Sequence, residues 1–132
     1  MSADQTESLT SILRTAIVEL VRRDGPDLSA RQLAVFLNSY LESEAQTVRG
    51  LAARLAVSKP AITRALDRLA EFDLIRRKID PLDRRSVLVQ RTSTGQAFMR
   101  DLRGILRSAA QVKPEPAVTN GRNRHTEMRT AH

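Results

Sequence analysis

Residues 57–91 read "VSKPAITRALDRLAEFDLIRRKIDPLDRRSVLVQR", and this stretch decides the fold. Its first half predicts a helix, because Ser58 is a suitable N-cap, Pro60 lies in the first turn, and apolar residues then recur at helical spacing. The apolar period then changes to that of strands, so residues 75–79 and 86–91 are predicted strands joined by "DPLDRR". The stretch therefore predicts a helix that runs directly into a basic β-hairpin.

The predicted helix has one apolar face and one polar face. A turn of about 100° per residue groups its apolar residues on one side: Ile62, Ala65, Leu66, Leu69 and Phe72. The opposite side carries Pro60, Thr63, Arg64, Asp67 and Glu71, with Lys59 and Arg68 on the flanks. The N-terminal half therefore exposes hydroxyl and cationic groups, whereas the acidic groups lie toward the C-terminal half.

Three more helices are predicted before this stretch and one after it. Residues 12–21 carry apolar residues at helical spacing until "DGPD" (24–27) ends the pattern. Ser29 is a predicted N-cap of the second helix, and Thr47 is a predicted N-cap of the third. After the hairpin, "TSTGQAFMRDLRGILRSAAQ" (92–111) returns to helical spacing.

Composition narrows the class of protein. Only three Phe, one Tyr and no Trp are present, so the core must be built from aliphatic side chains, which suits helices packed on helices. The absence of cysteine excludes disulfides, thiolate metal sites and thiol-based redox sensing. The longest apolar run, "LAVFL" (33–37), is too short to span a membrane, and the first residues lack the pattern of a signal peptide. We therefore expect a soluble protein of a reducing compartment, the cytoplasm, with no membrane partner.

The formal net charge of +7 is concentrated in the middle of the chain. Residues 1–46 carry a net charge of −3, whereas residues 47–91 hold eleven Lys and Arg against five acidic residues. Such a basic block is expected when the partner is a polyanion. A basic surface that is merely solvated is the alternative at this point.

Two helices joined by a short turn and followed by a basic hairpin have the order of a winged helix-turn-helix. The second helix of such a pair fits the major groove of DNA and presents its N-terminal side chains to base edges. A hairpin beside it can reach the adjacent minor groove, where the negative potential favours an arginine held by a short acidic neighbour. Arg84 and Arg85 are therefore predicted to lie at the hairpin tip because that tip enters a groove.

The chain also resembles the multiple antibiotic resistance regulator (MarR) family of bacterial transcription factors. The resemblance is carried by "TVRGLAARLAVSKPAITRALDRLAEFDLIRR" (47–77), "DPLDRRSVLV" (80–89) and "TSTG" (92–95). The hairpin string is its most specific part, since the helix-turn-helix alone would match several families. The resemblance implies a regulator that binds double-stranded DNA, usually a dimeric repressor, and it allows a small-molecule effector in a cleft between the dimer helices and the DNA-binding lobe.

The resemblance also implies roles for individual residues. Asp83 is similar to the aspartate of the family's wing, which orients Arg85 into the minor groove, and Arg77 to a basic residue at the wing base. The residues predicted to contact DNA are Thr47, Ser58, Lys59, Pro60, Thr63, Arg64, Arg68, Arg77, Asp83, Arg84 and Arg85. For Arg68, an ion pair with Asp67 or Glu71 is an equally good reading.

Three positions depart from the family pattern. Asp73 stands where a glycine usually follows the recognition helix, and aspartate tolerates a left-handed conformation less well than glycine. Arg91 replaces a usual leucine before "TSTG", and Gly50 replaces an acidic or polar residue.

The chain is predicted to have four parts. These are an N-terminal dimerisation helix (1–27), a winged helix-turn-helix domain (28–91), a C-terminal dimerisation helix (92–112) and a disordered basic tail (113–132). The fold class is thus mainly α with a small β-hairpin. The apolar stripes of the two flanking helices suit a dimer seam better than an ordinary core, and its predicted residues are Ile12, Ile17, Leu20, Phe98, Leu102, Ile105 and Leu106.

Two other functions compete with DNA binding. A winged helix used as a protein–protein interaction module would usually lack a cationic hairpin tip and recognition face. An enzyme has little support, because Asp80 and Asp83 lie among arginines that would keep both ionised. His125 and His132 have no partners that would complete a metal site. No catalytic residue, metal site or cofactor is predicted.

Overall fold

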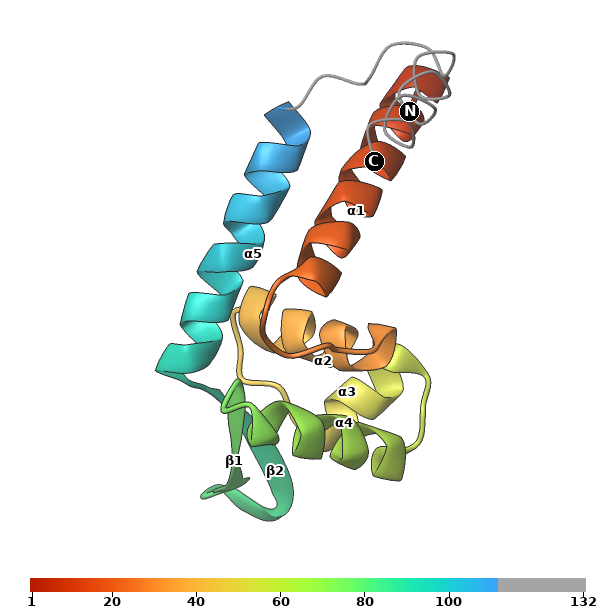
Figure 1. Ribbon diagram of the computed structural model, residues 1–132. Helices are drawn as coiled ribbons and strands as arrows, with labels where there is room; N and C mark the ends of the chain where they lie inside the picture. Colours follow the sequence, from red (N-terminus) through yellow and green to blue (C-terminus); the bar gives the residue numbers. More distant parts are fainter. Residues whose placement is uncertain (112–132) are drawn as a thin grey trace.

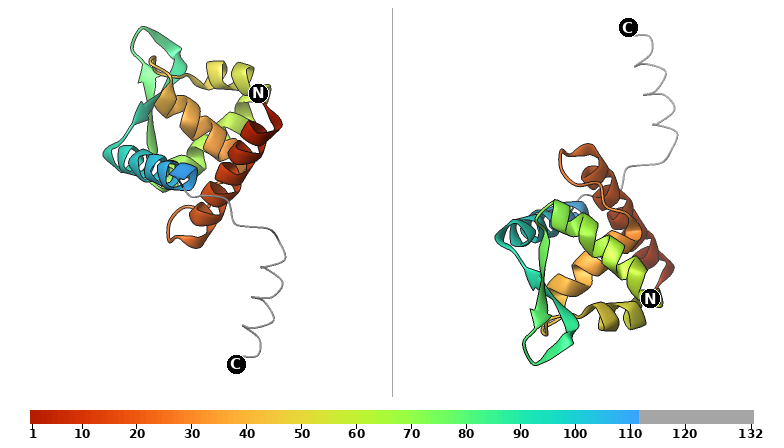
Figure 2. Two further views of the ribbon diagram at one scale, coloured as in Figure 1. Left: turned by 90° about the horizontal axis from the view of Figure 1, so that it is seen from above. Right: turned by 90° about the horizontal axis from the view of Figure 1, so that it is seen from below.

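A computed structural model describes residues 1–111, and the tail predicted for 113–132 lies outside the described residues. The elements follow in the order α1 (Ala3–Arg22), α2 (Ala30–Leu41), α3 (Val48–Leu55), α4 (Lys59–Glu71), β1 (Ile75–Asp80), β2 (Asp83–Arg91) and α5 (Ser93–Gln111). Helices α2 to α4 and the hairpin form a lobe, and α1 and α5 rise from it side by side as a stalk (Figure 1). The hairpin lies at the edge of the lobe when the molecule is viewed from above or below (Figure 2). The fold is mainly helical with one antiparallel hairpin, as predicted.

The predicted N-caps are confirmed. The side-chain oxygen of Ser29 accepts a hydrogen bond from Gln32 N, that of Thr47 from Gly50 N and that of Ser58 from Ala61 N. Each bond satisfies a backbone donor that the first helical turn leaves without a partner. These caps fix where α2, α3 and α4 begin.

Two residues in the left-handed conformation end the helices of the helix-turn-helix. Ala56 (φ 56°) ends α3, and Asp73 (φ 57°) follows α4 and turns the chain into β1. Asp73 is the position where the family usually has glycine, and its carboxylate accepts a hydrogen bond from the hydroxyl of Thr94 at 3.0 Å. This hydrogen bond offsets part of the cost of the left-handed backbone.

The hairpin differs from its prediction in extent. Half of the residues assigned to its connection belong to β2, which begins at Asp83, and Asp80 belongs to β1, so only two residues separate the strands. The register moves from Ile79 opposite Val87 to Asp80 opposite Asp83, which leaves residues 84–86 in a bulge. The extra residues therefore bend one strand near its tip rather than forming a wide loop.

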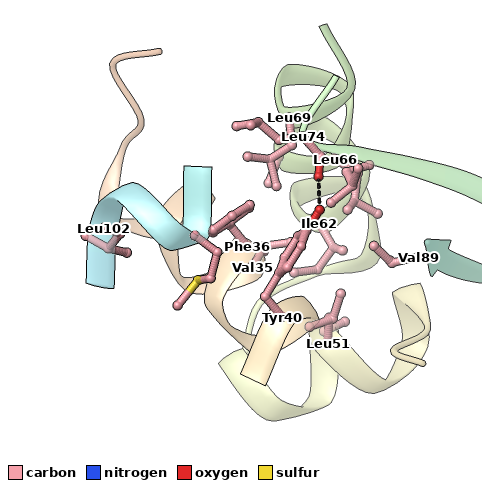
Figure 3. Packing of buried hydrophobic residues seen from close by; sticks show 14 residues of the cluster. Val35, Phe36, Tyr40, Leu51, Ile62, Leu66, Leu69, Leu74, Val89 and Leu102 are labelled. Atoms are coloured by element: carbon pink, nitrogen blue, oxygen red, sulfur yellow. Dashed lines mark hydrogen bonds between the residues drawn. The ribbon is translucent and has the colours of Figure 1, made fainter. Parts of the chain in front are cut away.

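The core lies where α2, α4, the hairpin and α5 meet (Figure 3). Phe36 stacks on Tyr40 with ring centroids 4.4 Å apart and meets Phe98 edge-on at 5.2 Å. Ile62 and Leu66 of α4 are fully buried against this group. Three of the four aromatic residues thus lie together, and aliphatic side chains supply the rest of the core.

The predicted dimer seam needs a correction at Leu102. Its side chain is only 5% exposed and belongs to the core of its own chain. Leu20 and Phe98 also pack against that core, whereas Ile12 and Ile105 are half-buried. Helix α1 leaves apolar residues exposed on its other side, and these are Leu9, Leu13, Ile17, Val18 and Val21. Leu106 of α5 is also exposed.

Candidate nucleic-acid interface

The N-terminal half of α4 presents the polar face that its sequence predicts. Lys59, Pro60, Thr63 and Arg64 are exposed, while Ile62 on the opposite side is fully buried. Ser58 lies at the start of this face, and its oxygen caps the helix. Burial of the apolar face fixes the rotation of α4, so these side chains point outward together.

Arg68, further along α4, is held by neighbours of its own helix. Its Nη1 lies 3.1 Å from a carboxylate oxygen of Glu71, and its guanidinium lies 4.6 Å from the ring centre of Phe72. The ion pair that competed with a DNA contact is therefore present. Within residues 1–111, Lys59, Arg64 and Arg84 make no ion pair, so their charges face solvent uncompensated.

Arg77 ties the hairpin to α4. Its Nη1 lies 2.7 Å from Oδ1 of Asp67, so β1 and α4 are joined by an ion pair that is part-shielded on the arginine side. The side chain predicted to face a DNA backbone is thus also one that positions the hairpin. Thr47 has a comparable structural role, since it caps α3 and also forms an isolated bridge with Leu88 of β2.

The distal half of the hairpin carries the predicted arginine pair. Oδ1 of Asp83 accepts a hydrogen bond from the backbone N–H of Arg85 at 3.1 Å and lies 3.6 Å from its Nε. Oδ2 of Asp83 accepts from the hydroxyl of Ser86 at 3.3 Å. The side chain of Arg85 is nevertheless 90% exposed, and Arg84 is exposed beside it. Asp83 therefore fixes the bulged backbone and pairs with Arg85, while both guanidinium groups stay exposed to solvent.

A polar joint at the base of the hairpin was not predicted. The hydroxyl of Tyr40 donates to the carbonyl of Leu74 at 2.6 Å (Figure 3). It accepts from the N–H of Thr92 at 3.0 Å. Arg91 donates to the carbonyls of Ser39 at 2.9 Å and Glu42 at 2.6 Å. The joint therefore connects the end of α2 to both ends of the hairpin. The only tyrosine in the sequence was the one available signal, but its partners are too far away along the chain to be identified from spacing.

Gly95 is required at the same joint. A Cβ atom at this position would collide with the hydroxyl of Tyr40 and the carbonyl of Leu74. Only glycine lets the first turn of α5 approach the lobe this closely. The "TSTG" string thus marks the contact by which α5 is attached.

Other kinds of site have little to support them in the described residues. Residues 1–111 contain no group of three or more His, Cys, Asp or Glu that could hold a metal ion. No helix in the same range is both long and apolar enough to cross a membrane. A small apolar cavity of about 60 Å³ lies between α1, α2 and α5, lined by residues that include Leu20, Leu33 and Phe98.

The helix-turn-helix and most of the hairpin match a known family. Residues 28–87 match the sequence profile of the MarR family. This stretch is a MarR-family domain. The resemblance predicted from the recognition helix and the hairpin is therefore confirmed for these residues, and α1 and α5 flank the MarR-family domain on either side.

Solved structures show the same fold over nearly the whole chain. A crystal structure of MarR is 24% identical, with a TM-score of 0.62, covering 96% of this chain and 93% of that one. The complex of Staphylococcus aureus MepR with DNA is 17% identical, with a TM-score of 0.60, covering 97% and 91%. CouR from Rhodococcus jostii RHA1, described as bound to p-coumaroyl-CoA, is 23% identical, with a TM-score of 0.58, covering 94% and 82%. At these identities the likeness concerns the fold, and a comparison with curated protein sequences found no significant match.

Proposed function

We propose that this protein is a transcriptional regulator that binds specific double-stranded DNA sequences as a homodimer and acts as a repressor in the cytoplasm, at the nucleoid. One observation carries the proposal: the exposed Lys59, Thr63 and Arg64 and the arginine pair of the hairpin are presented by elements at one end of the molecule, opposite the stalk (Figure 1). A MarR-family domain supports the same function.

The two parts of this surface suit the two grooves of DNA. The major groove admits a helix, so α4 can present Lys59 and Arg64 to base edges and phosphates. A hairpin at the side of that helix reaches the neighbouring minor groove, where Arg85 meets a negative potential that grows as the groove narrows. The two contacts together would give a register on the duplex as well as affinity.

The stalk supplies a reason for a dimer. The exposed apolar residues of α1, including Leu13 and Val21, would remain in water in a single chain. A second copy related by two-fold symmetry could cover this face and bring two recognition helices onto one duplex. A dimer seated on a promoter excludes polymerase, and this physical exclusion supports repression.

The small-molecule effector that the family resemblance allows stays a prediction. The structural neighbour CouR is described as bound to p-coumaroyl-CoA. The cavity between stalk and lobe is about 60 Å³, far smaller than the roughly 300–1,000 Å³ typical of ligand pockets. A ligand of ordinary size would therefore not fit in this cavity alone.

The test is binding to DNA selected from a genomic library, followed by footprinting and titration with salt. We expect a protected inverted repeat and a steep fall of affinity with salt, because each neutralised phosphate contributes about −0.9 to the log–log slope. Arg85→Ala should weaken binding, whereas Arg103→Ala, which removes another exposed arginine, this one on the stalk, should not. A protein-interaction module would bind duplex DNA weakly or not at all at low salt, and that result would rule out the proposal.

A further inference from the structure

The turn of the hairpin carries an apolar side chain that the fold does not use. Leu82 is 95% exposed, and Ile79 on the neighbouring strand is 58% exposed. Both lie on the part of the hairpin that extends beyond the core, whereas Ile75 and Val89 at its base are buried. The distal half of the hairpin is therefore apolar as well as basic.

The geometry of the turn does not explain a leucine. Asp80 and Asp83 are paired, so Pro81 and Leu82 are the two central residues of the turn. Oδ1 of Asp80 accepts a hydrogen bond from the N–H of Leu82 at 2.9 Å, which would serve any residue with a backbone N–H at this position. Turns of this length favour Gly, Asn, Asp or Ser after a proline, because these residues adapt to the backbone and are well hydrated. Neither the turn nor the core therefore selects leucine here.

The surroundings of Leu82 indicate which partner would accept it. The flanking exposed cations are Lys78, Arg84 and Arg85. An apolar tip surrounded by positive charge complements a minor groove, which has anionic phosphates on both edges and apolar sugar walls between them. Proteins that enter this groove use side chains such as Pro and Leu to wedge between base steps.

We propose that Pro81 and Leu82 form an apolar wedge that enters the DNA minor groove beside Arg85 and favours sites whose base step there is easily unstacked. The inference rests on the proposed DNA-binding function and adds a source of specificity to it. Proline stiffens the tip, the two aspartates fix its backbone through hydrogen bonds to Leu82 and Arg85, and the leucine supplies the inserted group. Pyrimidine–purine steps such as TA unstack most easily, so they should be preferred under the hairpin.

The test compares two duplexes that differ only in four base pairs under the hairpin, placed from the footprint of the wild-type protein. One carries TTAA, with a flexible central step, and the other carries AATT, which has the same composition but is stiff and narrow. We expect the ratio of affinities, TTAA over AATT, to fall about tenfold in Leu82→Gln. The ratio should be unchanged in Leu41→Gln, a matched substitution of an exposed leucine on α2.

Two further readouts separate a wedge from a charge effect. A 2-aminopurine placed at the TA step should brighten when the wild-type protein binds and remain quenched with Leu82→Gln. The salt slope should be equal for both proteins, because no charge is lost. An unchanged affinity ratio in Leu82→Gln overturns the wedge while DNA binding stands. The wedge is also overturned if Leu82→Gln loses binding to another protein or to vesicles and keeps the wild-type affinity ratio. Failure of the wild-type protein to bind any duplex at low salt would instead overturn the proposed function.

Discussion

At the scale of single residues, substitutions at Asp83 and Arg85 distinguish two proposed roles. Arg85 contacts the minor groove, and Asp83 orients Arg85. Arg85→Ala removes a proposed minor-groove contact and should weaken binding by about 1–3 kcal/mol. Asp83→Ala deletes a negative charge near phosphate, which by charge alone would tighten binding. The carboxylate also holds the N–H of Arg85 and the hydroxyl of Ser86, so we expect weaker binding because the bulge loses its shape. Fluorescence anisotropy with a labelled operator measures both effects.

The double variant decides whether Asp83 acts through Arg85. Once Arg85 is alanine, Asp83→Ala should lose most of its effect, because no side chain remains to be oriented. Arg84→Ala should mainly reduce the salt slope, by about one unit for each lost phosphate contact. Additive effects of Asp83 and Arg85 would contradict an orienting role.

A second prediction at this scale concerns the joint at the hairpin base. Tyr40→Phe leaves the carbonyl of Leu74 and the N–H of Thr92 without their partner in a buried place. Each unsatisfied buried group costs about 1–3 kcal/mol, so the free energy of unfolding should fall by at least that amount. Urea denaturation measures the loss. Thr94→Ala, which removes an exposed hydrogen bond nearby, is the control and should cost about 1 kcal/mol or less. Equal losses of unfolding free energy in the two variants would show that burial does not raise the cost of losing the hydrogen bonds of Tyr40.

At the scale of elements, α1 is the helix whose apolar face most needs a partner. Leu13→Asp combined with Val21→Asp should yield a monomer that remains folded, because both side chains are largely exposed in a single chain. Leu102→Ala should instead lower the free energy of unfolding by about 3–5 kcal/mol, because it opens a cavity in the core. Sedimentation and thermal unfolding distinguish the two results. A dimer of unchanged mass in the α1 variant would mean that the seam lies elsewhere.

The elements also show what the sequence could and could not predict. The caps and the exposed face of α4 were predictable, because capping and helical periodicity depend on residues a few positions apart. The bulge in β2 was missed, because it depends on the register between strands rather than on either strand alone. Leu102 was assigned to the wrong surface, since an apolar stripe does not reveal which neighbour covers it.

The position of Arg91 was visible as a departure from the family, but its role was not. Its hydrogen-bond partners are Ser39 and Glu42, about fifty residues earlier in the chain. The replaced leucine would have been apolar at a place where α2 leaves carbonyl groups without helical partners. The arginine satisfies these carbonyls, so the substitution is compatible with the same fold.

At the scale of the whole molecule, the net positive charge is concentrated in the segment that forms the elements proposed to contact DNA. The segment 47–91 holds eleven Lys and Arg against five acidic residues, a net charge of +6, and includes α4 and the hairpin, whereas the first 46 residues are net negative. A duplex would therefore be drawn toward the part of the lobe that α4 and the hairpin form. Because each bound lobe neutralises its own set of phosphates, the log–log salt slope should increase with the number of lobes that contact one duplex.

The last prediction uses this relation between the salt slope and the number of bound lobes. A symmetric dimer should protect an inverted repeat whose half-site centres lie about 34–36 Å apart or a multiple of that distance. The wild-type protein should show a log–log salt slope corresponding to on the order of 6–10 phosphate contacts. The monomeric variant Leu13→Asp/Val21→Asp keeps every residue of the lobe, so it should bind one half-site with about half that slope. Inserting five base pairs between the half-sites should weaken the wild-type protein strongly, because it rotates one half-site to the opposite side of the duplex. It should leave the monomeric variant unaffected, and equal losses in both would show that two lobes do not bind one duplex together.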